Sequence, residues 1–163
     1  MDTINNLMEA FAGESQANRK YLAFAKKADE EGLHQIARLF RAAAEAETVH
    51  AHNHLTVLKG VKSTEENLKE AIAGEVEEFT EMYPIFLKVA EEEKNKEAYW
   101  TFNVANQVEE IHAQLYQKAL DSIGENVEVA YYVCNFCGNT VEKDAPDICS
   151  ICGAPKSEFK KID

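Results

Sequence analysis

Two Glu-x-x-His pairs lie 62 residues apart in this chain of 163 residues. Glu47 and His50 form the first pair, and Glu109 and His112 form the second. Residues three apart share one face of a helix, so the two side chains of each pair can point inward together. Carboxylates and imidazoles that converge inside a helical bundle need cations, because the unpaired charges would repel one another. The pairs therefore predict a metal site with oxygen and nitrogen ligands.

An internal repeat adds two more glutamates to this set. The segment that ends at Glu14, residues 9–14, recurs 61 residues later as residues 70–75, which end at Glu75. The repeat predicts two helical hairpins of the same design, each with a glutamate on its first helix and a Glu-x-x-His pair on its second. Four carboxylates and two imidazoles form the ligand set of a carboxylate-bridged di-metal site, and such ligands suit iron or manganese.

Three further residues fall near the same helix faces. Glu78 comes three residues after Glu75, and it is either a seventh metal ligand or an exposed residue of a Glu-rich helix. Tyr21 lies two turns after Glu14, and Tyr83 follows Glu75 by a similar distance. Each tyrosine either donates a hydrogen bond to a ligand carboxylate or packs in the core.

All four cysteines belong to two Cys-x-x-Cys-Gly knuckles near the end of the chain. The first knuckle contains Cys134 and Cys137, and the second contains Cys149 and Cys152. Four thiolates bind either Zn or Fe in tetrahedral geometry, and the spacing does not distinguish the two metals. A segment of this size is too small to fold on a hydrophobic core alone, so metal binding would stabilise it. Two disulfides are the alternative.

Four amphipathic helices must position the carboxylates and histidines. We expect the first from residue 2 or 3 to residue 32, the second over 33–59, and the fourth over 95–123. The third opens at residue 63 or 64, where Ser63 and Glu66 can form a capping box. Pro84 lies within this third helix and lacks an N–H, which predicts a bend near Thr80.

Composition excludes several classes of function. The net charge of −12 argues against binding to nucleic acid or to anionic membranes, because phosphate groups would be repelled. No apolar run is long enough to span a membrane. The first residues lack the basic and apolar regions of a secretory signal, so we expect a cytoplasmic protein with reduced cysteines.

Taken together, these motifs resemble the rubrerythrin family over essentially the whole chain. The resemblance implies an all-α, ferritin-like four-helix di-iron bundle at residues 1–124, a linker at 125–130, and a rubredoxin-like domain with a four-cysteine iron site at 131–163. Zn could occupy the four-cysteine site of recombinant protein. Besides the two Glu-x-x-His pairs and Glu78, the matching segments are Phe11-Ala12-Gly13-Glu14-Ser15, Tyr131-x-x-Cys134-x-x-Cys137-Gly138 and Cys149-x-x-Cys152-Gly153-Ala154-Pro155, with Phe159 beyond.

The resemblance also implies a function and a role for each ligand. The family reduces hydrogen peroxide to water, with electrons that reach the di-iron site through the Cys-bound iron from an NAD(P)H-dependent redox partner protein. Ferroxidase or iron-handling activity is the alternative, and a non-catalytic zinc-ribbon module is a third possibility. The implied ligands are Glu14 at the first iron, Glu75 and His112 at the second, Glu47 and Glu109 as bridges, and His50 exchanging for Glu78 at the first iron on oxidation.

The link between the two hairpins is short for this fold. A ferritin-like bundle needs a crossover of roughly 30 Å between its second and third helices, at ~1.5 Å per helical residue. The available four to eight residues reach only about 14–28 Å. We therefore expect the hairpins to be exchanged between the chains of a homodimer or larger homo-oligomer. A simple up-down bundle and fraying of the helix ends are the rival explanations.

Overall fold

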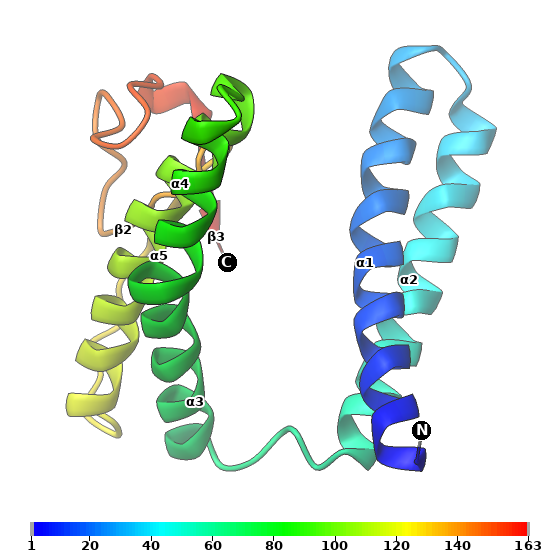
Figure 1. Cartoon of the computed structure of the whole chain (residues 1–163), viewed down its shortest axis with the longest axis horizontal. Helices are drawn as coiled ribbons and strands as arrows, with labels where there is room; N and C mark the ends of the chain where they lie inside the picture. Colours follow the sequence, from blue (N-terminus) through cyan, green and yellow to red (C-terminus); the bar gives the residue numbers. More distant parts are fainter. Residues whose placement is uncertain (1, 163) are drawn as a thin grey trace. The chain divides into compact units, whose positions relative to one another are not determined.

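The computed structural model describes residues 2–162, which form two compact units (Figure 1). Unit 1 is Met1–Lys62 and unit 2 is Ser63–Asp163. Each unit contains one of the two predicted helical hairpins, and unit 2 also contains the cysteine-rich segment. None of the described helices combines the length and the apolar character that a membrane span requires.

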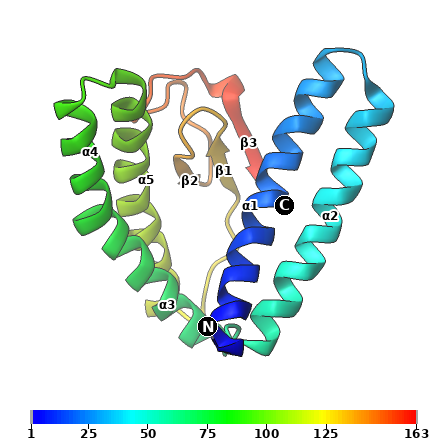
Figure 2. The ribbon, with the colours of Figure 1, turned by 45° about the vertical axis from the view of Figure 1, so that its right-hand side comes forward.

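Unit 1 is an antiparallel hairpin of α1 (Thr3–Glu30) and α2 (His34–Val57), which lie side by side in Figures 1 and 2. The Asp2 side chain caps α1 by accepting a hydrogen bond from the N–H of Asn5, as the sequence predicted. Gly32 has a φ of +75° in the connecting turn, a conformation that glycine adopts without strain. The buried residues along the seam are all small, which allows close approach of the helices: Ala25, Ala28, Ala37, Ala44 and Ala51.

The helices of unit 2 form the second hairpin. Its first arm is a continuous succession of three segments, and its second arm is a single helix. The capping box between Ser63 and Glu66 is present at the start of the first arm, which confirms the predicted helix start. The segments are α3 (Thr64–Glu77), the π-helical turn η1 (Glu78–Met82), α4 (Tyr83–Glu92) and, as the second arm, α5 (Lys96–Asp121).

The π-helical turn η1 occupies the place where the sequence predicted a bend. Pro84 has no N–H to donate to the carbonyl of Thr80, so the regular α-helical hydrogen bond is missing there. A wider turn accommodates this loss, and the Thr80 hydroxyl donates to the carbonyl of Val76 at 2.6 Å. The turn begins at Glu78 and therefore sets how this carboxylate is presented.

The cysteine-rich module of unit 2 follows a stretch, residues 122–130, without helix or strand. The predicted linker, residues 125–130, falls within this stretch. The module is a three-stranded antiparallel sheet with the order β2-β1-β3, and β2 contacts α5 (Figure 2). Its elements are β1 (Tyr131–Cys134), β2 (Thr140–Glu142), a 3₁₀ turn (Lys156–Glu158) and β3 (Phe159–Ile162).

Candidate metal centres

The first carboxylate and histidine group lies in unit 1. Glu14 from α1 and the pair Glu47 and His50 from α2 bring their ligand atoms within 4.8 Å of one another. The Nδ1 atom of His50 is 2.9 Å from Glu47 Oε2 and 4.0 Å from Glu14 Oε1. The side chain of His50 is 53% exposed, so unit 1 alone leaves this group open on one side.

Unit 2 contains the equivalent group, built from Glu75 on α3 and the pair Glu109 and His112 on α5. The Nδ1 atom of His112 is 2.8 Å from Glu109 Oε2 and 3.9 Å from Glu75 Oε1, nearly the distances found in unit 1. The structure thus brings six of the seven predicted helical ligands into two groups of three. The second group is more enclosed, since the His112 side chain is only 27% exposed.

The second ring nitrogen of His112 contacts the cysteine-rich module. Its Nε2 lies 2.9 Å from the hydroxyl of Thr140, and this hydroxyl donates to the carbonyl of Gly138 at 3.1 Å. A threonine hydroxyl has one hydrogen, so when it donates to Gly138 the donor to Thr140 is Nε2–H of His112, which is the tautomer that leaves Nδ1 available to a metal. Spacing did not reveal Thr140, because it lies 28 residues from His112 in the sequence.

This hydrogen-bond pattern provides a test of whether a metal fits the group. With its proton on Nε2, a neutral His112 directs the lone pair of Nδ1 toward Glu109 and Glu75. In the other tautomer Nδ1–H donates to Glu109 at 2.8 Å, and a cation bound at Nδ1 would take the place of this proton. Imidazole nitrogen with carboxylate oxygen is a ligand set that iron accepts, so the side chains present fit the predicted metal.

The protonation of the carboxylates in unit 2 reflects the same crowding. Burial, followed by the hydrogen bond and the charge of Glu109, raises the pKa of Glu75 to about 7. Burial also raises the pKa of Glu78, and the charges of Glu109 and Glu77 add to the effect. Burial and the charges of Glu109, Glu78 and Glu75 raise the pKa of Tyr83. Glu78 therefore interacts with the ligand group, although the group of three does not include it.

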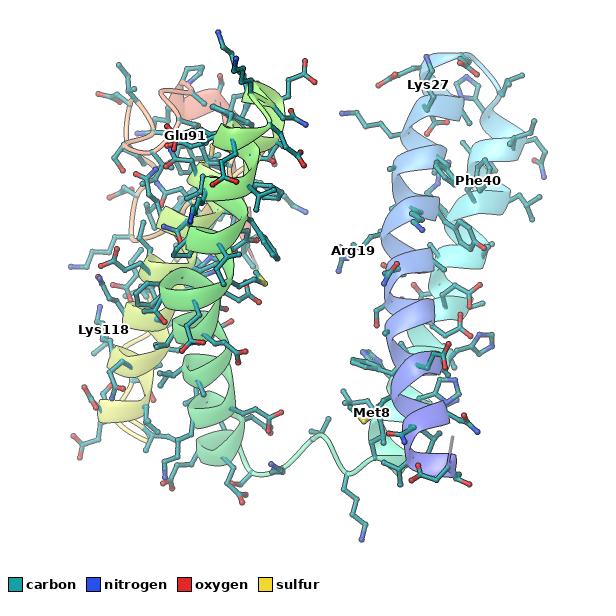
Figure 3. The ribbon with its side chains drawn as sticks, viewed as in Figure 1. Met8, Arg19, Lys27, Phe40, Glu91 and Lys118 are labelled. Atoms are coloured by element: carbon teal, nitrogen blue, oxygen red, sulfur yellow. The ribbon has the colours of Figure 1, made fainter. Side chains whose placement is uncertain are left out.

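The two predicted supporting tyrosines lie in aromatic clusters. The ring of Tyr21 is 6.3 Å from those of Phe24 and Phe40, between α1 and α2, and Figure 3 shows Phe40 at this level of the hairpin. The ring of Tyr83 is 6.3 Å from that of Phe102. Within residues 2–162, neither hydroxyl makes a hydrogen bond to a ligand carboxylate, so their proposed role at the metals stays a prediction.

A third Glu-x-x-His pair, Glu31 and His34, is present in the sequence but was not among the predicted site residues. These two residues flank the turn at Gly32, so no single helix places them on one face. His34 instead lies 3.0 Å from Asp29, and the hydrogen bonds from His34 and Arg41 lower the pKa of Asp29. This pair belongs to a surface ion-pair cluster and joins none of the ligand groups found among the described residues.

The four cysteines form a third group, in the module of unit 2. The sulfur of Cys134 is 3.7 Å from that of Cys152, and the sulfur of Cys137 is 3.6 Å from that of Cys149. Metal–sulfur bonds of about 2.3 Å in a tetrahedron place the sulfurs about 3.8 Å apart. A disulfide bond would need about 2.05 Å. The cysteines are free thiols in a metal-binding arrangement, and the disulfide alternative is wrong.

Backbone and side-chain donors surround these sulfurs. Gly138 and Gly153 have φ values of +80° and +78°, as the knuckle pattern requires. Burial raises the pKa of Cys149, but the N–H of Cys152 and the amide of Asn139 outweigh it, so the pKa falls to about 6. Asn139, which is 1% exposed, donates to Cys149 at 3.5 Å. Asn139 was not among the predicted site residues, although its position directly after a knuckle was a usable signal.

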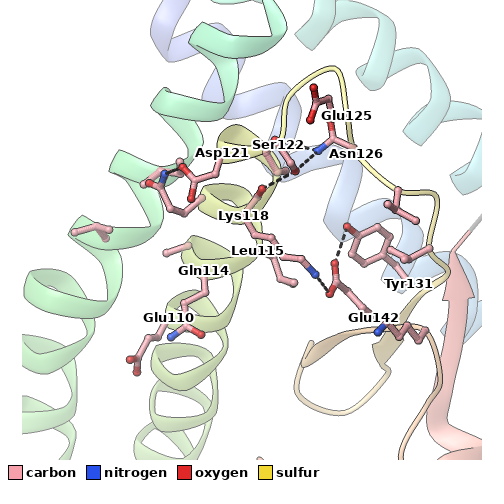
Figure 4. Close-up of a pocket in the computed structure, with 18 of the residues that line it drawn as sticks. Glu110, Gln114, Leu115, Lys118, Asp121, Ser122, Glu125, Asn126, Tyr131 and Glu142 are labelled. Atoms are coloured by element: carbon pink, nitrogen blue, oxygen red, sulfur yellow. Dashed lines mark hydrogen bonds and ion pairs between the residues drawn. The ribbon is translucent and has the colours of Figure 1, made fainter.

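A hollow of about 1000 Å³ lies in unit 2 beside these centres (Figure 4). Ile72, Val76 and Phe79 form an apolar wall, and Lys118 and Tyr131 both bond to Glu142 at its rim. None of the predicted metal ligands lines the hollow. It is therefore separate from the groups at which metal chemistry is expected.

Comparisons with known proteins agree with the two kinds of metal group. The rubrerythrin family profile matches residues 5–120, and the profile described as "Rubrerythrin, rubredoxin-like domain" matches residues 132–160. Rubrerythrin-2 of Clostridium acetobutylicum is 37% identical over 175 residues, covering 97% of this chain and 95% of the relative. Nigerythrin of Nitratidesulfovibrio vulgaris is 35% identical over 171 residues, covering 96% and 85%.

Solved structures of nigerythrin are also similar. The fully reduced, all-ferrous form has a TM-score of 0.61 and 34% sequence identity, covering 99% of this chain and 87% of that one. The predicted fold class is confirmed, with four helical arms followed by a rubredoxin-like module. The chain belongs to the rubrerythrin family, whose members bind iron in a di-iron site and in a rubredoxin-like site.

Proposed function

We propose that this protein is a peroxidase that reduces hydrogen peroxide to water and so protects against oxidative stress. The observation that carries the proposal is that one chain combines carboxylate and histidine groups with a four-cysteine centre, and that His112 and Thr140 connect them. Two ferrous ions supply the two electrons that, with two protons, convert one peroxide into two waters, while a Cys-bound iron carries single electrons.

The proposed roles of the side chains are those that the resemblance to rubrerythrins implies, and the two groups of three are compatible with them. Glu14 would hold the first iron, Glu75 and His112 would hold the second, and the remaining pair of helical glutamates, Glu47 and Glu109, would bridge them. His50 would exchange for Glu78 at the first iron on oxidation. Two observations support this exchange: His50 is the more exposed histidine, and Glu78 interacts with Glu109 at the start of a π-helical turn.

An NAD(P)H-dependent redox protein is the proposed electron donor. Phe136 lies between the cysteines of the first knuckle and Ile148 lies next to the second, and their exposed fractions are 60% and 67%. Exposed apolar side chains beside a metal centre suit a transient protein contact. The donor therefore has access to the four-cysteine centre without entering the helical hairpins.

We also propose that two chains exchange hairpins to complete each di-iron site. The backbone N–H groups of residues 58–60 still bond to carbonyls of α2, so only residues 61–63 lie between the two helical hairpins. The path from Gly60 to Thr64 therefore spans at most about 14 Å, against the roughly 30 Å that a ferritin-like crossover requires. Unit 1 also exposes large apolar side chains such as Met8, Leu39 and Val49, which a second hairpin would cover.

Stopped-flow mixing of the fully reduced protein with peroxide, and separately with O₂, tests the proposed activity. Peroxide is expected to oxidise the di-iron site faster than O₂ does, with oxidation of the iron in the four-cysteine centre following. Ferric iron bound by four thiolates absorbs visible light, so the two events are resolved by absorbance. Faster oxidation by O₂, together with accumulation of ferric iron from added ferrous salt, would instead support the ferroxidase alternative.

A further inference from the structure

Only one of the two ligand histidines is held by both ring nitrogens among the described residues. His50 has carboxylate partners alone, Glu47 and Glu14. His112 has the matching carboxylates at Nδ1 and, in addition, the Thr140 hydroxyl at Nε2. Thr140 belongs to the rubredoxin-like module, so a residue of one metal domain orients a metal ligand of the other.

The surroundings of Thr140 fix the position of its hydroxyl group. It lies at the start of β2, where it pairs with Val133 of β1, the residue before Cys134. Its hydroxyl also donates to the carbonyl of Gly138, which directly follows Cys137. The position of the hydroxyl is therefore set by the first knuckle, through one strand pairing and one hydrogen bond.

We expect the first knuckle to depend on its metal for order. The module's buried cluster consists of Cys134, Cys149 and Ala154, with a few half-buried neighbours, which is a small core for an independent fold. Metal binding to the four thiolates supplies much of the stability of such a module. Loss of that metal would release the strand pairing and the Thr140 hydroxyl together, and His112 would lose its fixed orientation and tautomer.

We propose that Thr140 is a positioning residue that couples metal binding at the four-cysteine centre to metal binding at the helical group of Glu75, Glu109 and His112. A metal in either site raises the affinity of the other. The coupling is reciprocal by thermodynamic necessity, so one factor describes both directions. Partners that orient metal-bound histidines typically contribute about 10–100-fold in metal affinity, and we expect a factor of about 10 here.

The proposal rests on the metal-binding role assigned to His112 and not on peroxide reduction, so it is tested by binding. In the full-length reduced protein, one equivalent of Cd(II) fills the thiolate site, because soft thiolates prefer it. Mn(II), which prefers oxygen and imidazole, is then titrated into the helical site and followed by the electron paramagnetic resonance of free Mn(II). The same titration is made without Cd(II).

Two variants separate the hydroxyl from the rest of the contact. Thr140→Val keeps the shape of the side chain but removes both hydrogen bonds, and Thr140→Ser keeps the hydroxyl. With Cd(II) bound, we expect Thr140→Val to weaken Mn(II) binding about 10-fold and Thr140→Ser to stay close to wild type. Without Cd(II), the Mn(II) affinity of wild type should fall to that of Thr140→Val. The Mn(II) affinity of Thr140→Val should be the same with and without Cd(II). Cd(II) affinity should change by the same factor when Mn(II) is saturating.

Two results would overturn the coupling. One is an equal Mn(II) affinity of wild type and Thr140→Val when Cd(II) is bound. The other is an effect of Cd(II) on the Mn(II) affinity of Thr140→Val that is as large as in wild type. If wild type binds no Mn(II) at all, the assignment of the helical ligands fails as well, which distinguishes the two failures. The thiolate-to-Cd(II) absorption of each variant shows whether the module has folded. Should Thr140→Val not fold, nuclear magnetic resonance of Zn(II)-loaded wild type decides, because a His112 Nε2–H that exchanges rapidly with water contradicts the hydrogen bond to Thr140.

Discussion

The two halves of the sequence repeat build the same group of three ligands in different surroundings. The distances from histidine Nδ1 to the two carboxylates are 2.9 and 4.0 Å in unit 1, and 2.8 and 3.9 Å in unit 2. His50 is about half exposed and has only carboxylate partners within residues 2–162, whereas His112 is more enclosed and also bonds to Thr140. Helical spacing thus sets the distance within each Glu-x-x-His pair, and the repeated hairpin design sets the distance to the third ligand. The other tertiary contacts set how firmly each histidine is held.

This difference gives a physical reason for the proposed exchange of ligands. A histidine held at both nitrogens keeps its orientation, and a histidine held only at Nδ1 can turn away when its metal changes charge. Only unit 2 contains the additional carboxylate, Glu78, whose pKa is raised by burial and by Glu109. The movable histidine would therefore come from one half of the repeat and its replacement from the other.

The largest expected effect concerns whether the two groups combine across chains. We predict that Glu47→Ala and Glu109→Ala each abolish peroxide reduction, because each removes a bridging ligand. Equal amounts of the two, unfolded and refolded together, should recover about a quarter of wild-type activity. Half of the dimers would be mixed, and one of the two sites in a mixed exchanged dimer would be intact. A mixture as inactive as its components would contradict hairpin exchange.

The second prediction compares the two histidines directly. His112→Ala should lower Fe(II) affinity by more than about 100-fold, because it removes a ligand and the contact to the module together. His50→Ala should lower Fe(II) affinity by about 10-fold or less, since Glu78 can take the vacant position. Anaerobic competition with a coloured Fe(II) chelator measures both affinities. Equal losses in the two variants would remove the basis for a fixed and a movable histidine.

The third prediction concerns the pH dependence of the metal-free protein. The pKa of Glu75 is about 7 in the folded state, above its usual value of 4.5, so the folded state binds more protons between these values. The contribution of Glu75 to stability is present below about pH 4.5 and is lost as the pH rises through about 7.

Thermal unfolding of metal-free protein should accordingly give a lower Tm at pH 7.5 than at pH 5.5. Glu75→Gln, which imitates the protonated form, should reduce this difference, and saturating Mn(II) should reverse it because a cation favours the ionised carboxylate. The same pH dependence in wild type and Glu75→Gln would place its origin in other groups.

The smallest expected effect concerns the helix starts of the two units. Asp2 accepts one backbone hydrogen bond, whereas Ser63 and Glu66 satisfy two backbone donors reciprocally. Ser63→Ala should therefore lower the free energy of unfolding by about 1 kcal/mol, and Asp2→Ala by less. Urea denaturation followed by circular dichroism compares the two variants. A larger loss of unfolding free energy for Asp2→Ala than for Ser63→Ala would show that the reciprocal hydrogen bonds in unit 2 add no stability.

Local patterns made much of the fold predictable. The helix starts at Asp2 and Ser63, the reversal at Gly32 and the interruption before Pro84 all depend on residues close in sequence. The form of the interruption was not predictable, because a missing N–H is compatible with either a kink or a π-helical turn. The pair Glu31 and His34 shows that the correct spacing is not sufficient, because a turn separates the two residues and they do not share a helix face.

The sequence by itself determined the chemistry of this protein: which carboxylates, imidazoles and thiolates can act together, since residues three apart on a helix or in a knuckle are neighbours in any tertiary arrangement. Only the tertiary structure decided that His112 bonds to Thr140, that Asn139 donates to Cys149, and that the two ligand groups differ in exposure. The two hydrogen bonds join residues that are not local neighbours in the chain, and the difference in exposure depends on what packs around each group. Local spacing in the sequence encodes neither.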